Sequence, residues 1–225
     1  MKKRVFLSLL AFTVIFASCS KDENDDRDVE DPVGTVYFEE RFDKMEWGGD
    51  YIANERGLRA VYIQNEDGKN IIDESQPPVD CAPTTDGSGD FYYHMADSYL
   101  INRRMIDWDG DKVYERPGYI KVGTGASRNA YLVTPSFTEI PEEGANVEVS
   151  FNLARWTTAS PQVFIEIVGG GTASVEYVET PEPAAWEAIT FTINGATPET
   201  KVRFVCDPRY DGRFFLDDVV VSKAE

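Results

Sequence analysis

The side chains that most often carry catalysis are sparse in this sequence and form no recognised pattern. His94 is the only histidine. The chain lacks both the Gly-x-Ser-x-Gly turn of a serine nucleophile and the His-Glu-x-x-His spacing of a zinc site. Glu40, Asp43 and Glu46 come nearest to a pair of catalytic carboxylates, but their spacing does not fit. We therefore predict a non-catalytic protein with no catalytic residue, and keep a polysaccharide lyase or glycoside hydrolase as an alternative.

Aromatic residues beside polar ones suggest a different chemistry, the binding of a sugar. Apolar sugar faces stack on exposed aromatic rings, while amides and charged groups bind the hydroxyls. Trp156 is the best candidate, because strict alternation places it on the polar strand face that carries Asn152, with Arg155 adjacent. Three further candidates lie in an irregular region: Trp108, Tyr92 and Tyr93. The alternative for Trp156 is that it covers the end of the fold.

The elements that must position these residues are strands. Residues 147–153 alternate strictly between apolar and polar, which is typical of a half-buried strand. Similar short runs recur with turns between them and without helical periodicity. We predict strands over 35–38, 119–122, 130–134, 147–153, 163–168, 174–178, 188–193, 201–206 and 213–221. This spacing predicts an antiparallel β-sandwich.

Residues 61–117 break this regularity. Turn signals crowd together there, including Asp67-Gly68, Pro77-Pro78 and Asp109-Gly110. A short helical piece is expected within Met95–Met105. We interpret this region as a long, loop-rich insertion in a single domain that spans 35–225.

The first 34 residues read as an export signal followed by a tether. Lys2, Lys3 and Arg4 precede a short apolar run that is too short to span a bilayer, and Ala17-Ser18 precede Cys19. Residues 1–18 resemble a bacterial lipoprotein signal, which implies lipidation at Cys19. Residues 19–34 are charged and almost free of apolar side chains. Their acidic start resembles the surface-export signal of Bacteroidota lipoproteins, so we expect an outer-membrane lipoprotein exposed on the cell surface.

Charge narrows the choice of partners. Removal of residues 1–18 takes away three basic residues and no acidic one, so the mature chain has 19 basic and 40 acidic side chains and a net charge of −21. Nucleic acid and anionic lipid are disfavoured, because phosphate binding depends on clustered Lys and Arg. Strongly anionic polysaccharides are disfavoured as well. Neutral polysaccharides or oligosaccharides and outer-membrane protein partners stay open, and contact with a membrane is expected through the lipid anchor only.

Two cysteines remain after Cys19, namely Cys81 and Cys206. In an oxidising compartment they could form a disulfide, or both could be buried free thiols. Sequence alone does not decide between these states.

Three separated segments carry a family resemblance: FEERFD at 38–43, NAYLVTPSF at 129–137 and GRFFLDDVVV at 212–221. In this order they resemble the jelly-roll group that includes cleaved-adhesin and MAM-like domains and carbohydrate-binding modules of Bacteroidota lipoproteins. The resemblance implies an all-β jelly roll of the galactose-binding or concanavalin-like kind. It also implies a structural Ca²⁺ held by Asp43 and Asp217, with Glu40 as a further ligand. Calcium prefers such oxygen ligands, completed by backbone carbonyls.

Together these observations predict a surface lipoprotein that binds a neutral glycan within a polysaccharide-capture system. The main competing class is an adhesin or assembly subunit that binds protein. A glycan array or an affinity gel with neutral polysaccharides would separate these two classes.

Overall fold

The computed structural model describes residues 34–48, 58–59, 61–77, 79–80, 89–125, 128–156, 159–180, 182–183, 185–210 and 212–225. They belong to one compact unit, whose bounds are Asp31 and Glu225. The predicted signal peptide, the tether up to Val33, Cys19 and Cys81 lie outside the described residues. No helix within the described ranges is long and apolar enough to cross a membrane.

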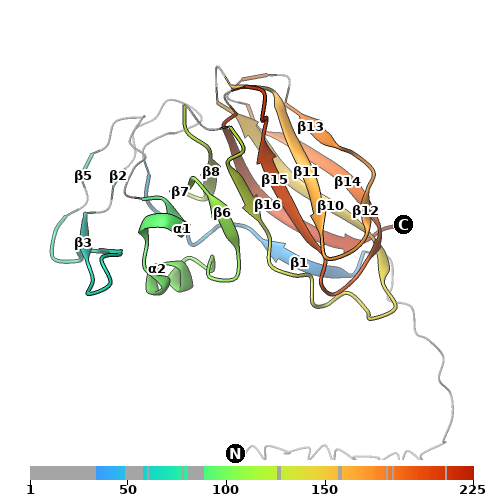
Figure 1. Cartoon of the computed structure of the whole chain (residues 1–225), viewed down its shortest axis with the longest axis horizontal. Helices are drawn as coiled ribbons and strands as arrows, with labels where there is room; N and C mark the ends of the chain where they lie inside the picture. Colours follow the sequence, from blue (N-terminus) through green and yellow to red (C-terminus); the bar gives the residue numbers. More distant parts are fainter. Residues whose placement is uncertain are drawn as a thin grey trace, which may run out of the picture. The chain divides into compact units, whose positions relative to one another are not determined.

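Two antiparallel sheets make up the core of the fold (Figure 1). The seven-stranded sheet has the order β12-β14-β10-β16-β8-β7, with β1 also paired to β16. Its strands are β1 (Val36–Glu40), β7 (Val113–Arg116), β8 (Tyr119–Val122), β10 (Ala145–Arg155), β12 (Thr172–Ala173), β14 (Glu187–Ala196) and β16 (Phe214–Lys223). The five-stranded sheet has the order β13-β11-β15-β9-β6. Its strands are β6 (Asp109–Asp111), β9 (Tyr131–Val133), β11 (Gln162–Val168), β13 (Tyr177–Glu179) and β15 (Lys201–Cys206).

The two sheets pack face to face through alternating apolar side chains. On β10, Val147, Val149, Phe151 and Leu153 are all buried, as their period of two predicts. The Phe151 ring from the seven-stranded sheet meets the Phe204 ring from the five-stranded sheet, with centroids 5.1 Å apart. The prediction of an all-β antiparallel sandwich is therefore confirmed.

Strand β16 contains a β-bulge next to the residues that pair with β1. Phe151 of β10 lies opposite two residues of β16, Asp218 and Val219, because the pairing shifts between Ser150 and Asn152. Asp218 has a left-handed backbone, with φ of 51°, which suits the extra residue of a bulge. Ahead of the bulge β16 pairs with β8, and beyond it β16 pairs with β1.

The predicted insertion contains real but small elements. They are β3 (Tyr62–Gln64), β4 (Asn70–Ile72), β5 (Val79–Asp80), α1 (Phe91–His94) and α2 (Asp97–Asn102). Strand β2 (Leu58–Arg59), which pairs with β5, lies just before the predicted insertion. The helix α2 lies inside the expected helical stretch. Strands β6 and β7 differ from the prediction, since they fall within 61–117 yet pair with β9 and β8 of the main sheets. The Asp109-Gly110 pair of β6 was interpreted as a turn. The two strands can be recognised only by their pairing with β9 and β8.

The insertion is fastened to the sandwich by a buried ion pair. Arg103, just after α2, donates from Nε to Glu115 Oε1 of β7 over 2.8 Å. Both side chains are at least nine-tenths buried, at 10% and 5% exposed. The backbone N–H of Glu46 donates to the same carboxylate oxygen over 2.5 Å. This cluster links α2, the segment after β1 and the edge of the seven-stranded sheet.

Candidate functional site

A row of side chains crosses the outer face of the five-stranded sheet. Strand pairing places Tyr177 opposite Phe164, Phe164 opposite Val205, and Val205 opposite Tyr131. We call these four residues the outer-face row. The alternate residues of the same strands point into the core, as buried Val163 and Phe204 show. The row therefore faces away from the sandwich core.

The members of the outer-face row differ in exposure. Tyr177 is 41% exposed, Phe164 and Tyr131 are half-buried, and Val205 is buried. The rings of Phe164 and Tyr177 lie 5.6 Å apart at 45°. Burial and the charge of Asp109 raise the pKa of Tyr131, so its phenol stays protonated at neutral pH. The row thus offers aromatic surface with phenol donors at both ends.

Polar side chains flank the outer-face row on one side. The Arg203 guanidinium lies 4.0 Å from the centroid of the Tyr131 ring and pairs with Glu166 over 2.6 Å. A guanidinium stacked on an aromatic ring keeps a defined orientation, because attraction to the ring holds its plane. This flank supplies charged groups beside apolar surface.

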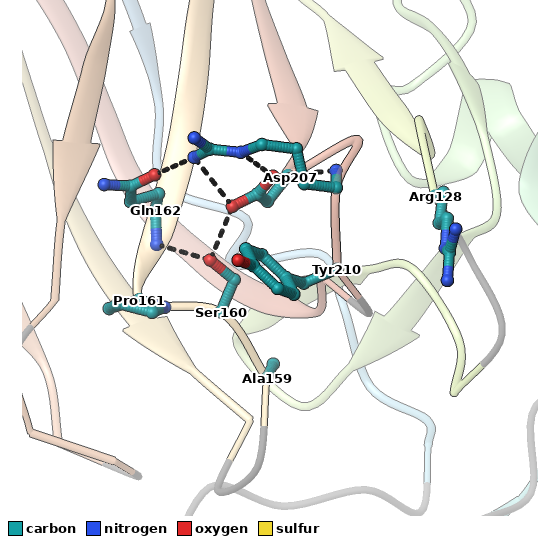
Figure 2. A pocket seen from close by; sticks show the side chains of 8 residues that line it. Arg128, Ala159, Ser160, Pro161, Gln162, Asp207 and Tyr210 are labelled. Atoms are coloured by element: carbon teal, nitrogen blue, oxygen red, sulfur yellow. Dashed lines mark hydrogen bonds and ion pairs between the residues drawn. The ribbon is translucent and has the colours of Figure 1, made fainter.

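A pocket adjoins the other side of the row and is shown in Figure 2. Its cavity of about 670 Å³ falls within the range of about 300–1,000 Å³ that is common for small-molecule sites. We call it the loop pocket, since it lies where the segments before β11 and after β15 meet. Its lining residues are Arg128, Ala159, Ser160, Pro161, Gln162, Asp207, Arg209 and Tyr210.

Asp207 organises the loop pocket. Its Oδ1 accepts from the backbone N–H and the Nε of Arg209, over 2.9 and 3.1 Å. Its Oδ2 accepts from Ser160 Oγ over 2.9 Å and from Arg209 Nη2 over 3.2 Å. Arg209 Nη2 also donates to Gln162 Oε1. The dashed lines of Figure 2 mark this network.

Local sequence explains why Asp207 can do this. An Asp side chain that accepts from the backbone two residues later forms an Asx turn, which ends β15. Gly212 lets the returning chain pass close by, because a Cβ there would lie 2.8 Å from the Asp207 nitrogen. Burial alone would raise the pKa of Asp207. The hydrogen bonds from Arg209 and Ser160 outweigh it, so the pKa of Asp207 is lowered and the group is ionised at neutral pH.

Arg209 joins the loop pocket to the outer-face row. Its guanidinium carbon lies 5.5 Å from the Phe164 ring centroid and 5.8 Å from that of Tyr210. Gln162 lies two residues before Phe164 on β11, so the two side chains are on the same face of the sheet. Gln162 donates from Nε2 to Glu179 over 2.7 Å. The two features therefore form one continuous surface of rings, amides and guanidinium groups.

The predicted platform around Trp156 has a different environment. Trp156 is half-buried and packs on Phe215, with ring centroids 6.0 Å apart. Lys121 Nζ lies 5.0 Å from its ring centroid and the Arg213 guanidinium 4.8 Å. Protein groups thus already contact the ring. Arg155 donates to the Ala159 carbonyl over 3.4 Å.

Asn152 lies on the same outward face as predicted. Its Nδ2 donates to Asp218 Oδ2 over 2.8 Å. With Arg41, Ser150 and Thr190 it lines a smaller cavity of about 290 Å³ on the seven-stranded sheet. The structure does not bring Asn152 and the outer-face row onto one sheet.

The insertion aromatics separate as well. Trp108 is 5% exposed and packs on Phe38 and Phe42, with centroids 5.8 and 5.6 Å away. Tyr92 is half-buried and donates its hydroxyl to the Met105 carbonyl over 3.3 Å. Tyr93 is 71% exposed. We leave these three residues out of the candidate site, because two face inward and the third stands on α1.

The residues of the implied calcium site gather near the β16 bulge. Burial and the charge of Asp218 raise the pKa of Asp217 to about 6, and the charge of Asp43 adds to the shift. Glu40 is buried and its Oε1 accepts the Phe42 N–H over 2.7 Å. Within the described ranges, no three His, Cys, Asp or Glu side chains gather as a metal site. Asp43 is near enough to influence the charge of Asp217, but two carboxylates fit a calcium ion only in part, and backbone carbonyls would have to supply the other ligands.

Cys206 is a free, buried thiol, and burial raises its pKa. Its Sγ lies 3.8 Å from the Val122 carbonyl oxygen. Of the two states that the sequence left open, the structure shows the free thiol at this position.

The sequence prediction missed the outer-face row and the loop pocket. The run Gln162–Val168 alternates, with Phe164 in the same phase as polar Gln162 and Glu166, but the prediction did not use this alternation. The signal that could have found it is Phe164 standing out of phase with Val163 and Ile165. Its significance depends on pairing with Tyr177, which only the fold supplies.

Comparison with known proteins gives structural neighbours alone. No family model matches the chain, and no curated protein matches it. Among solved structures, the CBM22-1 xylan-binding domain of Xyn10C from Paenibacillus barcinonensis has 8% identity and a TM-score of 0.40, covering 87% of this chain and 98% of that one.

Two other neighbours cover about half of this chain. The C-terminal CBM6 of the laminarinase LamC from Zobellia galactanivorans has 14% identity and a TM-score of 0.38, covering 51% of this chain and 91% of its own. The second N-terminal cellulose-binding domain of β-1,4-glucanase C from Cellulomonas fimi has 18% identity and a TM-score of 0.38, covering 52% and 86%. At these scores the likeness carries no argument about function, which must come from the site itself.

Proposed function

We propose that this protein is a non-catalytic, surface-anchored lipoprotein that binds a glycan chain across the five-stranded sheet. The outer-face row is the observation that carries the proposal. Strands in a sheet lie about 4.8 Å apart, so Tyr177 and Tyr131 stand about 14 Å apart across three strand spacings. A strip of that length suits several sugar units better than one.

The chemistry of the strip suits a mostly neutral carbohydrate. Aromatic rings bury the apolar faces of sugar rings, while Gln162, Glu166 and Arg203 beside them can bind hydroxyl groups. A protein with a net charge of −18 disfavours a polyanion as its main ligand. The acidic tether and Cys19 would hold this surface outside the cell, which suits capture of polysaccharide.

Removal of single rings from the strip tests the proposal. Each stacking contact contributes about 1 kcal/mol, so Tyr177→Ala and Phe164→Ala should each weaken binding about fivefold. Affinity gels with a panel of neutral polysaccharides measure the change. The matched control is Tyr93→Ala, which removes an exposed tyrosine from α1 and should leave affinity unchanged. Release of reducing or unsaturated ends from any polysaccharide would refute the non-catalytic part.

A second class of function, binding of a protein partner, has one observation in its favour. Four exposed apolar side chains fall within the insertion: Ile63, Tyr93, Ile101 and Ile106. Exposed apolar groups that gather in one region are typical of protein interaction sites. If the protein captures an outer-membrane partner but no glycan, and Ile101→Asp abolishes that capture, the adhesin or assembly function is the correct one.

A further inference from the structure

The hydrogen-bond acceptors of the loop pocket are already occupied. A carboxylate has about four lone-pair positions, and Asp207 accepts four hydrogen bonds from Arg209 and Ser160. Gln162 Oε1 accepts from Arg209. Ser160 Oγ donates to Asp207 and accepts from the Gln162 N–H over 3.2 Å. Little acceptor capacity is left for the hydroxyl hydrogens of a ligand.

Donors, in contrast, remain available. Arg128 is exposed, and within the described part of the chain its guanidinium makes no hydrogen bond or ion pair. Arg209 uses Nε and Nη2 on Asp207 and Gln162, which leaves its Nη1 for a ligand. The Tyr210 side chain is 62% exposed and can donate its hydroxyl. Figure 2 shows Arg128 apart from the Asp207 network, with Tyr210 between them in the view.

The charge of the pocket points the same way. Its lining has two arginines and one ionised aspartate, whose charge Arg209 already balances at close range. Arg128 is left as a net positive charge, although the chain as a whole carries −18. At physiological salt, exposed charges more than about 8 Å away are largely screened, so this local charge governs a ligand inside the pocket.

We propose that the loop pocket binds the carboxylate of a uronic acid unit, carried by a glycan whose other units lie on the outer-face row. Arg128 supplies the planar fork that binds a carboxylate with two parallel hydrogen bonds, while Arg209 Nη1 and Tyr210 can donate to hydroxyl oxygens of the same glycan. One negative charge matches the single unpaired positive charge. A neutral sugar fits less well, because its hydroxyls would need acceptors, and Asp207 has no lone pair left while Gln162 Oε1 has one.

This inference rests on the proposed function for the position of the glycan, but not for the recognition of the carboxylate. The two can therefore fail separately. Mostly neutral polysaccharides that carry occasional uronic acid units, before and after chemical reduction of their carboxylates to alcohols, are the matched probes, because only the charged group differs. The protein should bind the acidic form at least tenfold more tightly than the reduced form.

Variants assign the effect to the pocket. Arg128→Gln should remove the preference for the acidic form, with a much larger loss of affinity for the acidic form than for the reduced form. Arg128→Lys keeps the charge without the fork and should restore only part of the preference. Lys44→Gln, which removes another exposed positive charge, should have no effect. Tyr177→Ala should weaken both forms equally, since it tests the outer-face row.

Titration with monosaccharides covers the case in which no polysaccharide binds. Glucuronate should shift the ring NMR signals of Tyr210, and glucose should not. Equal affinity for acidic and reduced polysaccharides overturns the inference, as does a preference for sulfated over uronic sugars. An equal loss on both forms in Arg128→Gln, or no response to glucuronate, also overturns it.

Discussion

Asp207 and Arg209, two residues apart, are joined by two hydrogen bonds to one atom. The backbone N–H and the side-chain Nε of Arg209 both donate to Oδ1 of Asp207. A turn residue thereby fixes the guanidinium that joins the loop pocket to the outer-face row. The pair makes the turn after β15 part of the binding surface.

The first prediction concerns the pH dependence of this pair. Because the pKa of Asp207 is lowered on folding, its ionised form stabilises the native state above the unfolded pKa of 3.8. That stabilisation is lost as the pH falls through the lower folded value. Asp207→Asn should lower the free energy of unfolding by about 2 kcal/mol at pH 7, a value within the range for hydrogen bonds to charged groups. The variant should also lose less stability than the wild type on acidification. Urea unfolding from pH 2 to 7 measures both. Asp67→Asn, in an exposed turn, is the control, and parallel profiles for wild type and Asp207→Asn would contradict the prediction.

The second prediction concerns the Arg103–Glu115 pair that fastens the insertion. Glu115→Ala removes the carboxylate that accepts from Arg103 Nε and from the Glu46 N–H, and leaves Arg103 only its longer contact with Glu46, 3.3 Å, so the variant should destabilise the fold by about 3 kcal/mol. The double variant Arg103→Met, Glu115→Leu should lose less than Glu115→Ala alone, because no charge is left unpaired. A double-mutant cycle in urea measures the coupling, and simple additivity would show that the pair does not act as a unit.

The third prediction concerns calcium at the β16 bulge. The pKa of Asp217 is raised to about 6, so without metal its contribution to stability is present below 3.8 and is lost as the pH rises through 6. Calcium binds the deprotonated carboxylate, so added Ca²⁺ should raise the melting temperature at pH 7.5 and have little effect at pH 5. Asp217→Asn should abolish the difference. Identical melting curves with chelator and with excess Ca²⁺ at pH 7.5 would rule out the site.

The fourth prediction separates the two candidate surfaces. Since Phe215, Lys121 and Arg213 contact the Trp156 ring, Trp156→Ala should lower stability by about 2 kcal/mol and change glycan affinity less than twofold. The sequence-based expectation was a stacking platform, which would give about a tenfold loss of affinity. Calorimetric titration of the wild type and the variant decides between the two.

The fifth prediction concerns location. Cys19→Ala should leave the chain without its acyl groups and move it from the membrane fraction to the soluble fraction. Mass spectrometry of the wild type should detect the acyl chains. A variant that stays in the membrane fraction, together with a wild type of unmodified mass, would exclude the lipoprotein.

The sequence predicted the sandwich because one strand face must be apolar wherever two sheets pack. Residues 147–153 display that rule, and β10 forms where predicted. The prediction for 174–178 was less successful: the structure has β12 at Thr172–Ala173 and β13 at Tyr177–Glu179. Short edge strands carry too few residues to show a period.

The candidate site was harder to predict for a physical reason. Tyr177, Phe164 and Tyr131 belong to three strands that are far apart in the chain, and only pairing registers align them. Trp156 attracted the prediction because it stands on a visibly polar face. Its partners are Lys121 on β8 and Arg213 just before β16, so the sequence around Trp156 gave no indication that protein groups contact its ring.

The pairing of β1 with β16 governs when this fold can be completed. The first strand of the sandwich forms its ladder with the last, between Val36–Glu40 and Val219–Ser222. Strand β10 likewise needs β16 along one whole edge. The seven-stranded sheet therefore stays incomplete until the ten residues of β16 have left the ribosome, and closing so long a loop makes folding slow. In the proposed lipoprotein this delay would favour export, because a domain that cannot close early remains unfolded enough to be translocated.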